Sequence, residues 1–306
     1  MIAETPTQTS WDFEEGDEIV PGRYAVELLG GGRRYEAYLA WDDDLRTLVT
    51  VKALRPHLVN DFAARSTIAR EAAALRTLQH PALVRCFSAE LDGDRPHLLL
   101  EFLDGPRLST LIRCYGVILE QLLPLALELC AALHYVGARG YVHLDVKPKN
   151  VIMSAPPRLI DLSVATRLED VARLASPTGT DAYMAPEQCE PHRFAEIGPA
   201  SDIWGFGGTL YEAISRSLPF AEGDEKAETP AERWPQLEAE PRPLVADIPV
   251  TLADLILACL AKRPQDRPTA LEVADAVEPW AARLPGARLG LFRPGGRLRR
   301  SAFEER

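Results

Sequence analysis

The stretch that decides the fold reads His143-Leu144-Asp145-Val146-Lys147-Pro148-Lys149-Asn150, and an apolar run, Val151 to Met153, follows it. Asp145 can orient a hydroxyl group and accept its proton, and Lys147 can neutralise charge on a phosphate. The amide oxygen of Asn150 is a ligand that a hard cation such as Mg²⁺ accepts. Three polar groups at these offsets inside an apolar frame are hard to explain by packing. We therefore interpret the loop as a phosphoryl-transfer site.

Two further segments, one on each side of this loop, supply groups that phosphate chemistry needs. Downstream, Asp161 ends an apolar run, and a carboxylate there is a natural magnesium ligand. Upstream, Lys52 ends the apolar run Val49-Thr50-Val51, and Glu71 follows on a predicted helix. A lysine in that position is costly to bury unless it is paired. We therefore predict a Lys52–Glu71 ion pair that holds the lysine against the α- and β-phosphates of a nucleotide.

The remaining motifs lie near the N-terminus and in the second half of the chain. A glycine-rich turn reads Leu29-Gly30-Gly31-Gly32-Arg33-Arg34-Tyr35. Its glycines let backbone N–H groups approach phosphates, although three glycines alone equally suit a hairpin. Further on, Gly179 to Glu187 ends in Ala-Pro-Glu, and Ser201-Asp202-Ile203-Trp204 opens a predicted helix. Arg267 is the bidentate partner that we expect for Glu187.

Apolar periodicity divides the chain into a strand-rich first third and a helix-rich remainder. Short apolar runs between glycine and aspartate clusters predict strands at 25–29, 35–41, 48–54, 83–90 and 97–102, with one helix at 62–78. After Asp104-Gly105-Pro106 breaks the chain, helical spacing follows at 108–114, 120–139, 202–215, 252–262 and 270–283. This arrangement predicts an α+β fold with two unequal lobes.

Composition bounds the function classes. The chain has 306 residues and a net charge of −11, which argues against a nucleic-acid partner bound through its phosphates. Five cysteines without a C-x-x-C pair indicate free thiols in a reducing cytoplasm. We expect no transmembrane segment in the chain and interpret its most apolar stretch, Leu122 to Ala138, as a buried helix. The N-terminus lacks the basic and apolar regions of a signal peptide.

Composition also places the boundaries. Residues 1–21 are acidic and predict a flexible N-terminal tail, and the arginine-rich residues 284–306 predict a flexible basic tail. Between them we expect one lobe over 22–103 and the other over 104–283. The acidic, proline-rich segment 221–249 is expected to be an irregular surface segment.

In this order the motifs resemble those of the eukaryotic-like serine/threonine protein kinase family, over about residues 22 to 283. The resemblance implies a protein-kinase-like bilobal fold: a small β-rich N-lobe with one main helix, a larger mainly helical C-lobe, and ATP in the cleft between them. It implies catalytic roles for Asp145, Lys147, Lys52 and Glu71, and magnesium binding by Asn150 and Asp161. It implies ATP contacts from Gly30, Gly31, Gly32, Lys52, Glu101, Leu103 and Ile152, with Leu100 as the gatekeeper.

Two departures from the family pattern concern the nucleotide pocket, and a third lies beside the metal site. Tyr35 replaces the third loop glycine, which makes the loop bulkier and stiffer, and Thr50 replaces the small alanine beside adenine. The family's D-F-G reads Asp161-Leu162-Ser163 here. Because serine reaches positive φ less cheaply than glycine, we expect flipping of Asp161 to be restricted.

The fourth departure is Leu144, which replaces the arginine of H-R-D. In the family that arginine contacts a phosphorylated activation loop, so its loss removes a guanidinium partner for a phosphate. We therefore predict that activity does not strictly depend on phosphorylation of Ser176 or Thr178.

The leading hypothesis is a protein kinase with a signalling role that transfers the γ-phosphate of Mg-ATP, or Mn-ATP, to Ser or Thr of protein substrates. Its expected partners include itself, through autophosphorylation and a homodimer, and its expected location is cytoplasmic. A nucleotide-binding pseudokinase that acts as a scaffold is the alternative that the four departures suggest. A small-molecule phosphotransferase of the antibiotic-kinase kind is a third hypothesis, against which Lys147, Asp202 and Arg267 argue. Lys147 and Thr180 resemble the serine/threonine branch rather than the tyrosine branch.

Overall fold

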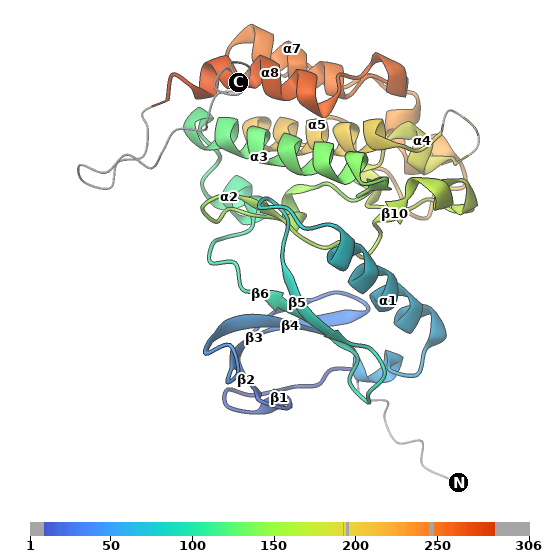
Figure 1. Cartoon of the computed structure of the whole chain (residues 1–306). Coiled ribbons are helices and arrows are strands. Elements are labelled where there is room, and N and C mark those ends of the chain that lie inside the picture. The colour runs from blue at the N-terminus through green and yellow to red at the C-terminus, as the bar shows by residue number, and fades with distance from the viewer. Residues whose placement is uncertain (1–8, 192, 194–195, 245–247, 285–306) are drawn as a thin grey trace, which may run out of the picture.

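The structure is a computed structural model that describes residues 9–191, 193, 196–244 and 248–284. It confirms the predicted fold class, because a curved sheet with one long helix forms the N-lobe and a set of helices forms the C-lobe (Figure 1). The chain passes between the lobes once β6 has ended at Glu101.

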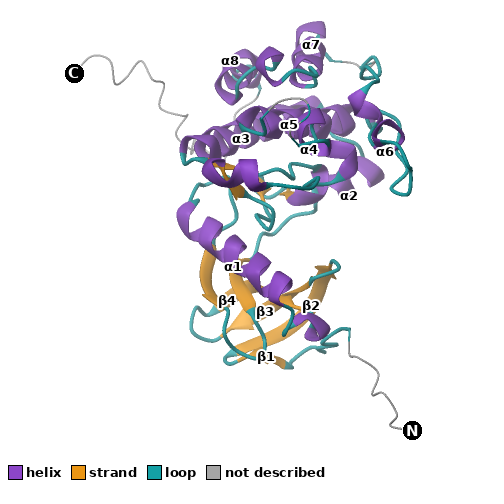
Figure 2. Ribbon diagram, turned by 90° about the vertical axis from the view of Figure 1, so that its right-hand side faces the viewer, coloured by secondary structure: helices purple, strands orange, loops and turns teal. Residues whose placement is uncertain are grey.

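The N-lobe is built on one antiparallel sheet, with strand order β1-β2-β3-β4-β6-β5. The strands are β1 (Glu18–Val20), β2 (Arg23–Gly31), β3 (Tyr35–Asp42), β4 (Thr47–Leu54), β5 (Cys86–Glu90) and β6 (His97–Glu101). Helix α1 (Phe62–Thr77) lies across one face of this sheet (Figure 2). Lys52 pairs with Ala37 of β3 and with Leu98 of β6, so three adjacent strands fix its position.

The N-terminal residues correct one expectation. The predicted flexible tail is wrong for residues 9–20, which pack on the N-lobe, whereas residues 1–8 lie outside the described part. Ile19 is fully buried in β1, which pairs with β2. The indole nitrogen of Trp11 donates to the carbonyl of Leu54 over 2.7 Å, and Phe13 packs edge-on against Tyr38. Apolar side chains spaced among the acidic residues account for this order.

The C-lobe is helical, and its elements lie close to the predicted ranges. The helices are α2 (Leu108–Cys114), α3 (Leu119–Ala138), α4 (Pro186–Cys189), α5 (Pro199–Ser215), α6 (Pro230–Arg233), α7 (Val250–Cys259) and α8 (Ala270–Ala281). Four short strands complete it: β7 (Tyr141–Val142), β8 (Val151–Ile152), β9 (Arg158–Leu159) and β10 (Thr166–Arg167). Helix α5 begins three residues before the predicted start because Pro199 occupies its first turn, where the missing N–H costs nothing.

Helix α3 is the central helix of the C-lobe, and it packs against both α5 and α8. It is also the one helix in the described part of the chain that is long and apolar enough to cross a membrane, with a mean hydropathy of 1.3. The expectation of no transmembrane segment stays a prediction, because a buried core helix meets the same criteria of length and composition. The expectation of a buried helix is confirmed, because 56% of the apolar window is buried within the lobe.

The segment 221–249 corrects a second expectation. It contains α6 and a short helical turn, and Trp234 and Gln236 within it are buried. The Gln236 side chain donates to the carbonyl of Asp181 over 2.7 Å, and Arg233 forms an ion pair with the same aspartate. This part of the segment therefore packs against the residues that follow Gly179 rather than lying free on the surface. The basic tail predicted for 284–306 lies, from residue 285 on, outside the described residues.

Candidate active site

A cavity of about 810 Å³ opens between the two lobes. Every residue proposed from the sequence for catalysis, nucleotide binding or metal binding lines it, except Asp145. Leu100 and Thr50 line its inner end on neighbouring strands, and Glu101 and Leu103 line it where the chain passes between the lobes. The structure thus brings together groups that lie as much as 131 residues apart in the sequence, from Gly30 to Asp161.

The predicted Lys52–Glu71 ion pair is confirmed. The Lys52 ammonium group donates to both carboxylate oxygens of Glu71, at 2.7 and 2.9 Å, and to Asp161 Oδ1 at 2.9 Å. Glu71 is 1% exposed, so the pair lies in a setting of low dielectric. Burial alone would lower the pKa of Lys52, but Glu71 and Asp161 outweigh it and hold that pKa above its ordinary value. Lys52 is therefore a permanent positive charge at the inner end of the cavity.

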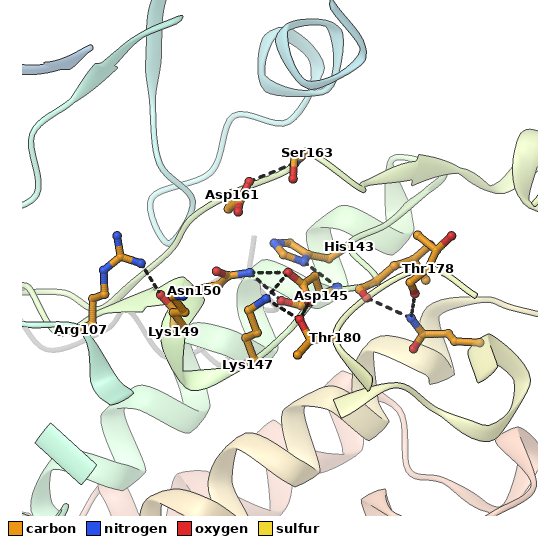
Figure 3. A network of polar contacts seen from close by, with 12 residues as sticks. Arg107, His143, Asp145, Lys147, Lys149, Asn150, Asp161, Ser163, Thr178 and Thr180 are labelled. Atoms are coloured by element: carbon orange, nitrogen blue, oxygen red, sulfur yellow. Dashed lines mark hydrogen bonds and ion pairs between the residues drawn. The ribbon is translucent and has the colours of Figure 1, made fainter. Parts of the chain in front are cut away.

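Asp145 is the centre of a second network, on the C-lobe side of the cleft (Figure 3). Its Oδ2 accepts from Lys147 Nζ at 2.6 Å and from the Asn150 amide nitrogen at 2.9 Å. Its Oδ1 accepts from the Thr180 hydroxyl at 2.7 Å, and Lys147 also donates to that hydroxyl. Donors from the catalytic loop and from the activation segment, residues 161–187, therefore fix the Asp145 carboxylate.

Thr180 contacts Asp145 directly, whereas the sequence marked it only through its resemblance to the serine/threonine branch. Two further residues that were not proposed as site residues hold the loop backbone. Both carboxylate oxygens of the buried Asp202 accept 2.7 Å bonds from the backbone N–H groups of His143 and Leu144. Gln188 donates to the carbonyl of Leu144, so two separate helices brace the same turn. This bracing accounts for the φ of +64° that Leu144 adopts, which a branched side chain rarely does.

The expected Glu187–Arg267 pair is confirmed as a bidentate contact. The guanidinium donates from Nη1 and Nη2 to the two carboxylate oxygens, at 2.7 and 2.9 Å. Both side chains are 0% exposed, and Ser201 donates a further bond to Glu187. The pair connects α4 to the turn before α8, and so anchors the end of the activation segment to the C-lobe.

Two of the departures from the family pattern, Tyr35 and Ser163, lie close to Lys52 and Asp161 respectively. The Lys52 ammonium lies 4.7 Å from the centre of the Tyr35 ring, whose hydroxyl is buried without a partner among the described residues. Burial, reinforced by Glu71, raises the pKa of Tyr35 to about 12, so the phenol stays protonated. The positive φ beside the metal site belongs to Asp161, at +66°, and not to Ser163. Ser163 does not adopt a positive φ in this conformation, so the φ of Ser163 is not what would restrict flipping of Asp161.

The oxygen donors of Asn150 and Asp161 fit a magnesium ion. The Asn150 amide nitrogen donates to the backbone carbonyl and to the carboxylate of Asp145, and the Asn150 amide oxygen takes no part in these two bonds. Burial acts to raise the pKa of Asp161, but the charge and hydrogen bond of Lys52 hold it below the ordinary value, so the carboxylate is ionised at neutral pH. The described residues hold no cluster of three or more His, Cys, Asp or Glu that could bind a metal. A carboxylate and an amide oxygen suit Mg²⁺ that is completed by substrate phosphates.

Two lobes enclose a cleft lined by Lys52, Glu71 and Asp161, and the loop that holds Asp145 lies beside it (Figure 3). This arrangement defines the protein kinase class. The protein kinase domain family matches residues 24–280, and the chain belongs to it. The chain is 30% identical to serine/threonine-protein kinase PknB of Mycobacterium leprae over 92% of its own length and 45% of that protein. It is 31% identical to PknB of Mycolicibacterium smegmatis over 87% of the chain and 44% of that protein. It is 32% identical to the probable serine/threonine-protein kinase PkwA of Thermomonospora curvata over 85% and 34%. The chain thus spans less than half the length of these relatives.

Proposed function

We propose that the chain transfers the γ-phosphate of ATP to serine or threonine hydroxyls of protein substrates. The observation that carries the proposal is the fixed Asp145 carboxylate, held by Lys147, Asn150 and Thr180 beside a cleft that contains Lys52 and Asp161. Catalysis of phosphoryl transfer consists largely of such positioning and charge stabilisation. The relatives, which are named serine/threonine-protein kinases, support the same activity.

The proposed roles of Asp145, Lys147 and Lys52 follow from where each side chain lies in or beside the cleft. Asp145 orients the acceptor hydroxyl and takes its proton as the hydroxyl oxygen bonds to the γ-phosphorus and the bond from that phosphorus to the ADP oxygen breaks. Lys147, which contacts Asp145, neutralises charge on the moving phosphate. Lys52, fixed by Glu71, holds the α- and β-phosphates. These assignments place one charged group at each point where charge changes during the reaction.

The nucleotide and metal contacts are part of the proposal. Asn150 and Asp161 would hold Mg²⁺ or Mn²⁺, which when bound shields the negative charge of the phosphates. The backbone of Gly30 to Gly32 would lie over the phosphates. The adenine would contact Glu101, Leu103 and Ile152, which line the far side of the same cavity.

The scaffold hypothesis is not favoured. Its basis was the four departures, and none of them removes Lys52, Glu71, Asp145 or another of the polar groups that the reaction needs. Autophosphorylation, a homodimer and a cytoplasmic location stay predictions. Lys147 and Thr180, which contact each other beside Asp145, resemble the serine/threonine branch and support the choice of Ser and Thr over Tyr.

The test compares the wild-type chain with Asp145→Asn and with Asp94→Asn, a matched change at an exposed turn. Each variant is incubated with labelled ATP, Mg²⁺ or Mn²⁺ and a generic protein substrate, and the phosphorylated residues are identified by mass spectrometry. We expect transfer to Ser and Thr by the wild type and by Asp94→Asn. Asp145→Asn should lose at least about 10³-fold in rate while it still binds nucleotide. Equal transfer by both variants would refute the assignment of Asp145.

A further inference from the structure

A segment in front of the family match forms part of the N-lobe. Residues 9–13 precede position 24, where the match begins, yet Trp11 and Phe13 among them are partly buried and contact the N-lobe. The rings of Trp11 and Phe13 stack with their centres 6.1 Å apart. The guanidinium of Arg95 lies 4.5 Å from one ring and 4.7 Å from the other. Together with the 2.7 Å bond from Trp11 to the Leu54 carbonyl, these contacts fix the segment at the end of β4.

The residue after Leu54 connects this segment to the glycine-rich turn. Nη1 of Arg55 donates to the carbonyl of Thr9 and to Glu36 Oε1, both at 2.8 Å, and Nε donates to the carbonyl of Gly32 at 2.8 Å. Glu36 is 1% exposed, and its other oxygen accepts from the backbone N–H of Trp11 at 3.1 Å. The Arg55 guanidinium thus bonds both to the N-terminal segment and to the turn that lines the cleft, and the buried Glu36 carboxylate bonds to the N-terminal segment and to Arg55.

The turn is packed directly against this guanidinium. A Cβ atom at Gly31 would lie 3.0 Å from Nη2 of Arg55 and 2.9 Å from the carbonyl oxygen of Tyr35. The backbone N–H of Arg55 also donates to the carbonyl of Arg34, at the other side of the turn. Arg55 therefore contacts the turn from Gly31 to Arg34, and any shift of its side chain moves the backbone that faces the nucleotide pocket.

We propose that residues 9–13 are a clamp that positions the glycine-rich turn for nucleotide binding, through the positioning residues Arg55 and Glu36. Without the clamp, Arg55 loses the Thr9 carbonyl and Glu36 loses the N–H of Trp11. A buried carboxylate that loses a donor draws the guanidinium toward itself or admits water, and either change releases Gly32. The clamp rests on the proposed function only in requiring that this cleft binds ATP.

The test uses the full chain and three single variants. Trp11→Ala removes the anchor, and Arg55→Lys keeps the charge but replaces the planar fork of donors, which reaches separate acceptors through Nε and Nη1, with a single ammonium nitrogen. Phe62→Ala is the matched control, because Phe62 is an N-lobe aromatic that is 86% exposed. The dissociation constant of a fluorescent ATP analogue is measured without turnover, well below the melting temperature of each variant. The KM for ATP and kcat follow on the same preparations.

We expect Trp11→Ala and Arg55→Lys each to raise the dissociation constant and KM for ATP about tenfold, with kcat changed less than about twofold. Phe62→Ala should leave all three unchanged. The combination of Trp11→Ala with Arg55→Lys should raise the dissociation constant by much less than the product of the two single effects, because both break one network.

A lower melting temperature with an unchanged dissociation constant would overturn the proposal, since it would show that the segment only adds stability. A fully multiplicative double variant would overturn it as well. If Trp11→Ala does not fold, Trp11→Phe keeps an aromatic ring but loses the bond to the Leu54 carbonyl. We then expect the dissociation constant to rise by about threefold or more, and an unchanged value would overturn the proposal. Because binding is measured without turnover, the clamp can fail while the proposed kinase activity stands, and the reverse.

Discussion

The prediction with the widest consequence concerns Leu144, which replaces the arginine of H-R-D. Its side chain is 3% exposed in an apolar cluster with Val142, Val171 and Ile197. Val171 belongs to the segment that follows Asp161, and Ile197 lies just before α5, so the cluster connects the catalytic loop to the first part of the activation segment and to the stretch that precedes α5. Apolar packing therefore occupies the place where the family uses a charged contact. We predict that it holds the segment without a phosphate.

The magnitudes separate two perturbations. Truncation of a buried leucine to alanine costs about 2–5 kcal/mol. If about 3 kcal/mol of this falls on docking of the activation segment, the docking equilibrium constant falls on the order of 100-fold. By contrast, Ser176 is exposed, and Thr178 donates only to the exposed carbonyl of Ser176. Removing both hydroxyls should therefore change turnover by less than about twofold.

The assay measures turnover and the free energy of unfolding for Leu144→Ala and for the double variant Ser176→Ala/Thr178→Ala. Thr180 is left intact because it bonds to Asp145. We expect a loss of turnover on the order of 10- to 100-fold for Leu144→Ala and near wild-type turnover for the double variant. A loss of several orders of magnitude in the double variant would refute the reasoning, as would full activity in Leu144→Ala.

Three further predictions concern stability. Arg267→Met should lower the free energy of unfolding by about 3–5 kcal/mol, because it leaves the carboxylate of Glu187 buried and unpaired, and Glu187→Met on top of it should recover part of the loss in a urea titration. Tyr35→Phe should leave that free energy unchanged or raise it by up to about 1 kcal/mol, since the lost hydroxyl is buried without a partner; a loss above that amount would reveal a bond to it. Asp161 has a lowered pKa in the folded state, so its ionised form contributes stability above its unfolded pKa of about 3.9, and this contribution is lost as the pH falls through the folded pKa. The difference in unfolding free energy between wild type and Asp161→Asn should therefore be constant above about pH 5 and shrink below about pH 4; a difference that grows on acidification would contradict the sign.

The sequence was sufficient for features that depend on order and local periodicity. The Lys52–Glu71 pair was predicted because a buried lysine needs a partner and the next helix offered one carboxylate on its apolar side. The helix at 62–78 was correct to one residue, since α1 ends at Thr77. The Glu187–Arg267 contact was predicted because a guanidinium can pair with a carboxylate through two parallel hydrogen bonds.

The features that the sequence could not supply depend on contacts between distant residues. The acidic composition of residues 1–21 predicted a loose tail, but folding depends on where Trp11 and Phe13 find partners, and these lie at Leu54 and Arg95. No local pattern encodes such a contact. The bond between Thr180 and Asp145 is of the same kind, because it joins a turn to a loop that lies 35 residues before it.

Two of the four departures from the family pattern, at Tyr35 and Leu144, act in one direction. The Tyr35 ring lies over Lys52 and replaces a flexible glycine with a packed side chain. Leu144 replaces a charge that needs a phosphate partner with an apolar contact that needs none. Arg55 joins the glycine-rich turn to an N-terminal segment that precedes the family match. The changes at Tyr35 and Leu144 each replace an adjustable contact with packing, and we infer that this packing helps to keep the catalytic residues of the cleft in place.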